Sequence, residues 1–250
     1  MIAAAYTAWR YARGAVDGSF ADSVAHARDL VSAERSLHLF IEPDVHAWAA
    51  DNAVPGEVAR WGYANLHFKG SALALLVIYF GYRGSFGFVR NTVIAAMAIS
   101  ALGYWLYPTA PPRFLPEFSL DPAITGNQPV ISDPGDPFLN PFAAVPSMHV
   151  GLSLIFAWSL GLLVRPRWLK AILFAYPLLM TYVVVASGNH WWLDALFGAM
   201  IAAAAAGLAA LLSRLNPDWA FMGGDEDEDR EGGDEGGNSR GTVDRTVVAA

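Results

Sequence analysis

Residues 191–213 read WWLDALFGAMIAAAAAGLAALLS, an apolar stretch that carries a single charged residue, Asp194. About 20 such residues are needed to cross the ~30 Å hydrocarbon core of a bilayer as a helix. Four similar stretches precede it, at residues 61–82, 91–107, 146–164 and 168–187. Because all five occur in one chain, the sequence predicts an all-α, polytopic membrane bundle rather than a soluble protein with apolar core helices. Residues 1–16 are either a shortened sixth span or a surface helix, so about six spans are expected.

The composition agrees with a membrane protein. Apolar types make up 54% of the 250 residues and charged types only 16%, whereas soluble domains carry about 25% charged residues. The absence of cysteine excludes a disulfide scaffold, a thiolate zinc site and a cysteine nucleophile. The net charge of −7 is concentrated in residues 214–250, so the rest of the chain is nearly neutral and offers no basic surface for nucleic acid.

The chain divides into three regions by composition. Residues 1–59 contain the N-terminal apolar segment and an amphipathic stretch, which we expect to lie in the membrane interface or simply to cap the bundle. Residues 60–213 form the expected membrane bundle, with a long proline-rich external loop at residues 108–146. Residues 214–250 are an acidic, glycine-rich tail that is expected to be disordered and cytoplasmic.

The amphipathic stretch covers residues 22–50. Its apolar positions, from Val24 to Ile41, recur near a helical period. Charged residues, including Glu34, are assigned to the opposite face of this helix. Pro43 is expected to end or kink the helix, since proline lacks a backbone N–H and clashes with the preceding turn.

Positive charge indicates the orientation of the bundle. The basic residues in and beside the short connections between spans are Arg83, Arg90, Arg165, Arg167, Lys170 and Arg214. Cytoplasmic loops of membrane proteins carry an excess of lysine and arginine, so this side is expected to face the cytoplasm. The loop at residues 108–146 and the turn at Gly188 and Asn189 then face outward. The prediction is a multi-pass protein of the cell membrane.

Two predicted helix starts on the outer side carry ionisable residues, which are costly inside a membrane and therefore point to function. His149 begins one helix, and His190 and Asp194 begin another. His190 and Asp194 are four residues apart and share a helix face. A carboxylate in that position can bind one imidazole nitrogen, fix the tautomer and leave the other nitrogen as a nucleophile or base.

The same side of the membrane offers groups that can bind an anion. Ser147 and Asn189 are residue types that cap helix N-termini, and two helix N-termini facing one space attract a phosphate. Arg113 follows the second strong span on this side and can form a bidentate phosphate contact, or extend to lipid headgroups. Phosphoryl transfer needs little beyond a nucleophile, an acid and charge stabilisation.

Two other functions remain open from these residues. His149, His190 and Asp194 also fit a metal site with two histidines and one carboxylate, as in a membrane metal-dependent enzyme. The same polar set can line a pathway in a transporter-like or otherwise non-catalytic protein. Survival of activity after chelator treatment would exclude the metal enzyme.

The histidines also lie in segments that resemble known motifs. Pro146-Ser147-Met148-His149 resembles the Pro-Ser-x-His motif of the type 2 phosphatidic acid phosphatase superfamily, and His190-x-x-x-Asp194 resembles its third motif. The resemblance implies a metal-independent enzyme without a cofactor, acting on a phosphate-linked lipid such as a phospholipid or an isoprenoid phosphate. It implies that His190 attacks phosphorus to form a phospho-histidine, that Asp194 orients His190, and that His149 protonates the leaving group.

A further segment resembles one branch of that superfamily. Pro-Thr-Ala-Pro-Pro-Arg at residues 108–113 is similar to the inositol phosphorylceramide synthase branch, which implies transfer to an alcohol such as inositol as an alternative to hydrolysis by water. The superfamily's phosphatases carry Ser-Arg where this chain has Val183 and Val184, a loss that the branch shares. Lys69, close to His67 in the first strong span, is a candidate replacement cation or a lysine that reaches the lipid headgroups.

Overall fold

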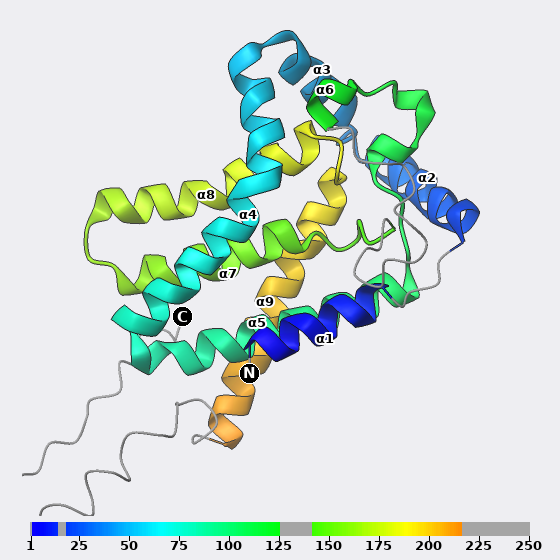
Figure 1. The fold of residues 1–250 in the computed structure, drawn as a ribbon. Coiled ribbons are helices and arrows are strands. Elements are labelled where there is room, and N and C mark those ends of the chain that lie inside the picture. Colours follow the sequence, from blue (N-terminus) through cyan, green and yellow to red (C-terminus); the bar gives the residue numbers. More distant parts are fainter. Residues whose placement is uncertain (1, 15–18, 126–141, 217–250) are drawn as a thin grey trace, which may run out of the picture.

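The computed structural model describes residues 2–14, 19–125 and 142–216, and within them the fold is all-α, as expected. Figure 1 shows the arrangement of the helices. Their bounds are α1 (Ile2–Gly14), α2 (Phe20–Ser36), α3 (Glu42–Asp51), α4 (Ala53–Gly81), α5 (Arg83–Leu106), α6 (Pro122–Thr125), α7 (Met148–Leu163), α8 (Arg167–Ala186) and α9 (Trp192–Leu215). The tail expected to be disordered lies outside the described residues beyond residue 216, and so does the part of the proline-rich loop at residues 126–141.

Helix α7 is the centre of the bundle. It packs against α4, α5, α8 and α9, and it crosses the middle of the molecule in Figure 1. Most of its side chains are buried, among them Leu152, Ile155 and Phe156 in the main apolar core. A helix that is apolar on all sides is expected at such a buried position.

Among the described residues, three helices are long and apolar enough to cross a membrane, namely α5, α8 and α9, which indicates a membrane protein. Helix α7 is apolar but shorter, with 16 residues. Helix α4 falls outside this set, and even its more apolar C-terminal part, residues 64–81, contains the polar residues Asn65, His67 and Lys69. The expected count of six spans is therefore not confirmed.

The N-terminal apolar segment forms α1, a helix of 13 residues. At 1.5 Å per residue it is about 20 Å long, which is shorter than the hydrocarbon core of a bilayer. It lies along α5 (Figure 1), where the indole N–H of Trp9 donates to Ser100 Oγ at 3.1 Å.

The amphipathic stretch is two helices rather than one. Helix α2 ends at Ser36, followed by His38 at a positive φ of 59°, and α3 begins at Glu42. The prediction that Pro43 ends or kinks a helix was wrong. Pro43 occupies the first turn of α3, where its missing N–H has no helical acceptor to lose.

The assignment of Glu34 to the polar face of α2 was also wrong, since its side chain is fully buried. Glu34 follows Leu30 by four residues and Val31 by three, so it lies on the same helical stripe as these buried side chains. This stripe faces the start of α9.

The described part of the proline-rich loop wraps the same end of the bundle. It contains two short 3₁₀ turns, η1 (Pro112–Phe114) and η2 (Pro116–Phe118), and helix α6. Thr109 pairs with Ala143 in an isolated bridge, and the carbonyl of Ala110 accepts from the indole of Trp191 at 3.0 Å. These bonds hold the loop against the start of α9.

Candidate active site at the crossing of α7 and α9

A close crossing of two helices brings the predicted catalytic residues together. A side chain at Gly198 on α9 would collide with the backbone carbonyl of Ser147, and one at Gly151 on α7 would lie 2.9 Å from the carbonyl of Gly198. The backbone N–H of Ser147 donates to the carbonyl of Asp194 at 3.0 Å. The first turns of α7 and α9 are therefore in backbone contact.

The two histidines face each other across this crossing. His149 Nδ1 lies 3.1 Å from His190 Nε2. The other nitrogen of His190, Nδ1, lies 3.1 Å from Asp194 Oδ2 and 3.0 Å from the carbonyl of Ala144. Both of these groups accept hydrogen bonds, so they place the ring proton on Nδ1 and leave the Nε2 lone pair directed at His149.

Helix α4 adds two aromatic side chains to the site. The ring of Tyr63 stacks on His149 with centroids 5.0 Å apart, and the ring of His67 lies 4.2 Å from that of His149. From the sequence, His67 was a candidate replacement cation together with Lys69, and its contact with His149 was not expected. Its position one helical turn from Tyr63 on α4 is the pattern that places both rings on one face.

Arg113 is held beside the site by the turn that precedes α9. Its backbone N–H donates to the carbonyl of Gly188 at 3.0 Å, and its guanidinium donates to Asn189 Oδ1. The amide nitrogen of Asn189 in turn donates to Ser187 Oγ at 2.9 Å. Asn189 thus orients the arginine next to His190 and does not cap α9, whose N-cap is Trp191.

Ser147 lies at the N-cap of α7, as its residue type indicates. It is fully buried, makes no capping bond, and its Oγ has no hydrogen-bond partner among the described residues. A buried hydroxyl without a partner is costly. It lies two residues before His149.

The start of α9 is already occupied by carboxylates. The backbone N–H groups of Trp191, Trp192 and Leu193 donate to Asp194, Glu42 and Glu34, respectively, at 3.0, 2.6 and 2.8 Å. The expectation that two helix N-termini form the anion site was therefore wrong for α9, because these N–H groups have acceptors. Sequence reasoning missed both glutamates, and only for Glu34 does the spacing from Leu30 and Val31 indicate burial.

Lys69 does not join the site. Its side chain is exposed and donates to Asn65 Oδ1 at 2.7 Å on the surface of α4. The described residues also contain no group of three or more histidine, cysteine, aspartate or glutamate side chains arranged to hold a metal ion. His149 and His190 direct a ring nitrogen at each other instead of at a common point.

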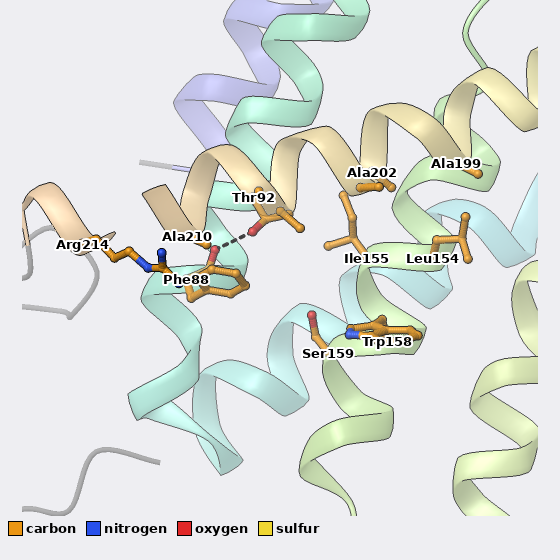
Figure 2. Close-up of a pocket in the computed structure, with 13 residues that line it drawn as sticks. Phe88, Thr92, Leu154, Ile155, Trp158, Ser159, Ala199, Ala202, Ala210 and Arg214 are labelled. Atoms are coloured by element: carbon orange, nitrogen blue, oxygen red, sulfur yellow. Dashed lines mark hydrogen bonds between the residues drawn. The ribbon is translucent and has the colours of Figure 1, made fainter. Parts of the chain in front are cut away.

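A cavity of about 600 Å³ lies elsewhere, between α5, α7 and α9 (Figure 2). It is lined mainly by alanine and other apolar side chains, with Arg214 at one end. None of the predicted site residues lines it. The cavity and the histidines are thus separate features of the same helices.

A sequence comparison adds to this geometry. The family model described as the PAP2 superfamily matches residues 28–208. The chain belongs to the PAP2 superfamily. The match includes α4, α7 and α9 up to residue 208, and thus every candidate site residue of this PAP2 protein. No curated protein and no solved structure matches the chain. Membership in the PAP2 superfamily, together with the apolar helices, indicates a membrane phosphatase-type function.

Proposed function

We propose that this protein is an integral-membrane phosphatase or phosphotransferase that acts on a phosphate-linked lipid through a phospho-histidine. One observation carries the proposal: His190 has its Nδ1 on Asp194 and the Ala144 carbonyl while its Nε2 faces His149. A nucleophile needs a free lone pair and a neighbour that handles the proton of the leaving group. The proposed chemistry requires no metal and no cofactor.

The first half-reaction forms the enzyme intermediate. His190 Nε2 attacks phosphorus, a P–N bond forms and the bond from phosphorus to the leaving alkoxide breaks. His149 gives its proton to that alkoxide. Asp194 stays ionised and stabilises the positive charge that develops on the His190 ring. Substrate has to enter between the two rings, which lie in direct contact in its absence.

The second half-reaction reverses these roles. His149, now neutral, takes a proton from the acceptor, whose oxygen attacks phosphorus while the P–N bond breaks. Water as acceptor gives hydrolysis, which releases free phosphate from a phosphomonoester and leaves a phosphomonoester from a phosphodiester. An alcohol such as inositol gives transfer and a new phosphodiester or phosphomonoester. The same residue thus acts first as acid and then as base.

Arg113 is the proposed phosphate-binding cation, supported by Ser147 and by the bond from Asn189 that orients it. Arginine presents a planar fork that matches two phosphate oxygens. At the two positions where the phosphatases of the superfamily carry Ser-Arg, this chain has Val183 and Val184, which are buried in apolar packing. Arg113 lies next to His190 through Gly188 and Asn189, so it can replace that missing charge.

The resemblance of residues 108–113 to the inositol phosphorylceramide synthase branch favours transfer over hydrolysis. The proposed substrates are a phospholipid or an isoprenoid phosphate, with inositol or another alcohol as acceptor. We place the site at the outer face of the cell membrane, in a multi-pass protein, because the basic connections lie at the opposite helix ends.

The test is a lipid assay with purified protein in vesicles. Labelled phospholipid or isoprenoid phosphate is incubated with and without myo-inositol, and free phosphate, lipid product and phospho-enzyme are measured. Free phosphate without inositol indicates hydrolysis of a phosphomonoester. Label in inositol phosphate indicates transfer when the lipid alkoxide leaves, and label in an inositol lipid indicates transfer when the headgroup of a phospholipid leaves. Absence of a trapped phospho-enzyme, with lipid flux across the vesicle instead, would support the transporter-like alternative and overturn the proposal.

A further inference from the structure

Two glutamates from the N-terminal helices meet at the start of α9. Glu34 on α2 and Glu42 on α3 are 0% and 2% exposed. One oxygen of each accepts from consecutive backbone N–H groups, those of Leu193 and Trp192. The second oxygen of each, Oε2, is buried and has no donor among the described residues.

The two carboxyls interact through a side-chain hydrogen bond, so one proton between them would satisfy these bare oxygens. Two buried carboxylates in contact cannot both stay ionised, because burial and like charge each disfavour the charged form. Burial, together with the negative charge of Glu42, raises the pKa of Glu34 to about 9. The charged groups facing Glu34 are Glu42 from α3 and Asp194 from α9, and Asp194 binds His190. His46, one turn after Glu42, binds the Ala186 carbonyl and the Asp121 N–H.

We propose that Glu34 and Glu42 share one proton and act as a positioning pair, which fixes the first turn of α9 so that Asp194 reaches His190. The three acceptors Asp194, Glu42 and Glu34 sit on three consecutive N–H groups of that turn. Loss of either glutamate leaves one of these groups buried without an acceptor and allows the turn to shift. The kinetic part of this proposal rests on the proposed function.

The experiment compares shape-conserving and truncating variants. Glu34→Gln keeps an acceptor for Leu193 and offers its amide N–H to Glu42 in place of the shared proton. It is expected to retain the wild-type kcat at neutral pH. Glu34→Ala removes both contacts and is expected to lower kcat with little change in KM. Glu57→Gln, at an exposed glutamate paired with Arg60 on α4, is the matched control and is expected to change neither.

The pH profile separates positioning from a merely structural role. Wild-type kcat is expected to decline above about pH 9, where Glu34 ionises next to Glu42 and Asp194. Glu34→Gln cannot ionise and is expected to lack this decline. Wild-type kcat in Glu34→Ala, or a loss in Glu34→Gln as large as that in Glu34→Ala, would overturn the proposal.

A second readout does not depend on activity. Thermal unfolding of wild type and Glu34→Gln is measured across the same pH range, and the two curves are expected to diverge as pH rises toward about 9. If the melting temperatures of wild type and Glu34→Gln change with pH in parallel, the proposal of a shared proton is overturned, even if the protein is active. If they diverge in a protein that has no phosphatase or transferase activity, the shared proton is supported and only the proposed function is contradicted.

The cavity in Figure 2 supports a second inference, independent of the two glutamates. Arg214 is the one charged residue among the described residues that line it, and Phe88, near the start of α5, lies at the same end. Helices α5 and α9 are candidate membrane spans, so the cavity lies along hydrocarbon. Ala199, Ala202, Ala206 and Ala210 leave room along α9 for a chain to pack.

We infer that this cavity holds one acyl chain of an anionic phospholipid whose phosphate contacts Arg214. Charge complementarity selects the anionic headgroup, since arginine binds phosphate oxygens by charge-assisted hydrogen bonds. The apolar lining selects the chain. In the tail, residues 225–235 carry no apolar side chains that could fill the cavity, whereas residues 219–222 do, and the tail is therefore removed in one arm of the test. The site is independent of the proposed catalytic chemistry.

Thermal stability in nanodiscs tests this inference. Phosphatidylglycerol is expected to raise the melting temperature of wild type above its value in phosphatidylcholine. Arg214→Gln and Ala206→Leu, which fills the cavity, are expected to lose this difference. Arg167→Gln, at an exposed arginine outside the cavity, should retain it. The inference would be overturned if Arg214→Gln showed the same difference in melting temperature between the two lipids as wild type. It would also be overturned if wild type showed this difference only after removal of residues 217–250, because the tail would then be the occupant of the cavity.

Discussion

Gly198 on α9 lies directly against the backbone carbonyl of Ser147 on α7, with no room for a β-carbon between them. This contact sets the distance between the two helix starts, because Ser147 precedes His149 by two residues and Gly198 follows Asp194 by four. We therefore expect Gly198→Ala to separate the helices and weaken both folding and catalysis.

Gly198→Ala is expected to lower the melting temperature in detergent and to reduce phospho-enzyme formation, since the clash is with backbone that cannot rotate away. Gly207→Ala on the same helix is the control. A β-carbon there meets nothing within 4 Å, so it should be neutral or stabilise α9 by up to ~1 kcal/mol through helix propensity. Equal melting temperatures for the two variants would contradict the close crossing.

Substitution of the three site residues should give a graded loss of activity. His190→Asn removes the nucleophile, and no labelled phospho-enzyme is expected. His149→Asn should slow its formation by roughly 10²–10⁴-fold, the usual contribution of a general acid. The effect should be smallest for substrates whose leaving group is a weak base. Asp194→Asn should be milder than His190→Asn, because it alters the tautomer and keeps the nitrogen. A phospho-enzyme that persists in His190→Asn and disappears in His149→Asn would reverse the two roles.

Arg113 and Asn189 should behave as a unit. Arg113→Lys keeps the charge and loses the planar fork, so we expect a raised KM for the phosphate-bearing substrate and a smaller fall in kcat. Asn189→Ala removes the acceptor that orients the guanidinium and should have a similar effect. The double variant should then be little worse than Arg113→Lys alone. Fully additive losses in kcat/KM would show that the two residues act separately.

Stability should depend on pH through Glu34. Its pKa is raised from 4.5 to about 9 by burial and by Glu42, so between these values the folded chain holds a proton that the unfolded chain has lost. The stabilisation is fully present below about pH 4.5 and is lost as pH rises toward about 9, by at most ~1.4 kcal/mol per pH unit. The free energy of unfolding of Glu34→Gln, relative to that of wild type, should therefore rise between pH 4.5 and about 9 and stay constant at higher pH. Unfolding curves of the two proteins at several pH values measure this difference.

Single cysteines can test the orientation, since the chain has none of its own. Ser119→Cys, exposed in the loop beside the site, should react with a membrane-impermeant maleimide on intact cells. Arg167→Cys, at the exposed start of α8, should react only after permeabilisation. The reverse labelling pattern would place the histidines at the cytoplasmic face.

The class of fold was predictable because long apolar stretches have few alternatives, and α5, α8 and α9 confirm it. The number of membrane spans could not be predicted, because α1 is short and α4 is polar over its first part. The proximity of His149, His190 and Asp194 was expected from helix position alone, and the structure places them in contact. Their catalytic roles remain a prediction.

The buried acids were missed for a definite reason. A charged side chain on an amphipathic helix is normally assigned to the solvent face, and only the spacing of Glu34 from Leu30 and Val31 argues against it. Its acceptor role depends on the Leu193 N–H, which is 159 residues away in sequence. No local pattern reveals such a partner. The occupied N-terminus of α9 could not be foreseen for the same reason.

Asp194 holds two neighbours with different parts of itself. Its carboxylate binds His190, whereas its backbone carbonyl receives the N–H of Ser147 and so docks α7 on α9. The docking bond itself therefore does not depend on the side chain at this position, provided that the side chain fits the buried site and still accepts from the Trp191 N–H. An asparagine at 194 keeps an oxygen for the Trp191 N–H, so it should remove the proposed catalysis and leave the contact between α7 and α9 in place; inactive descendants with asparagine at 194 and an unchanged glycine at 198 should therefore still fold.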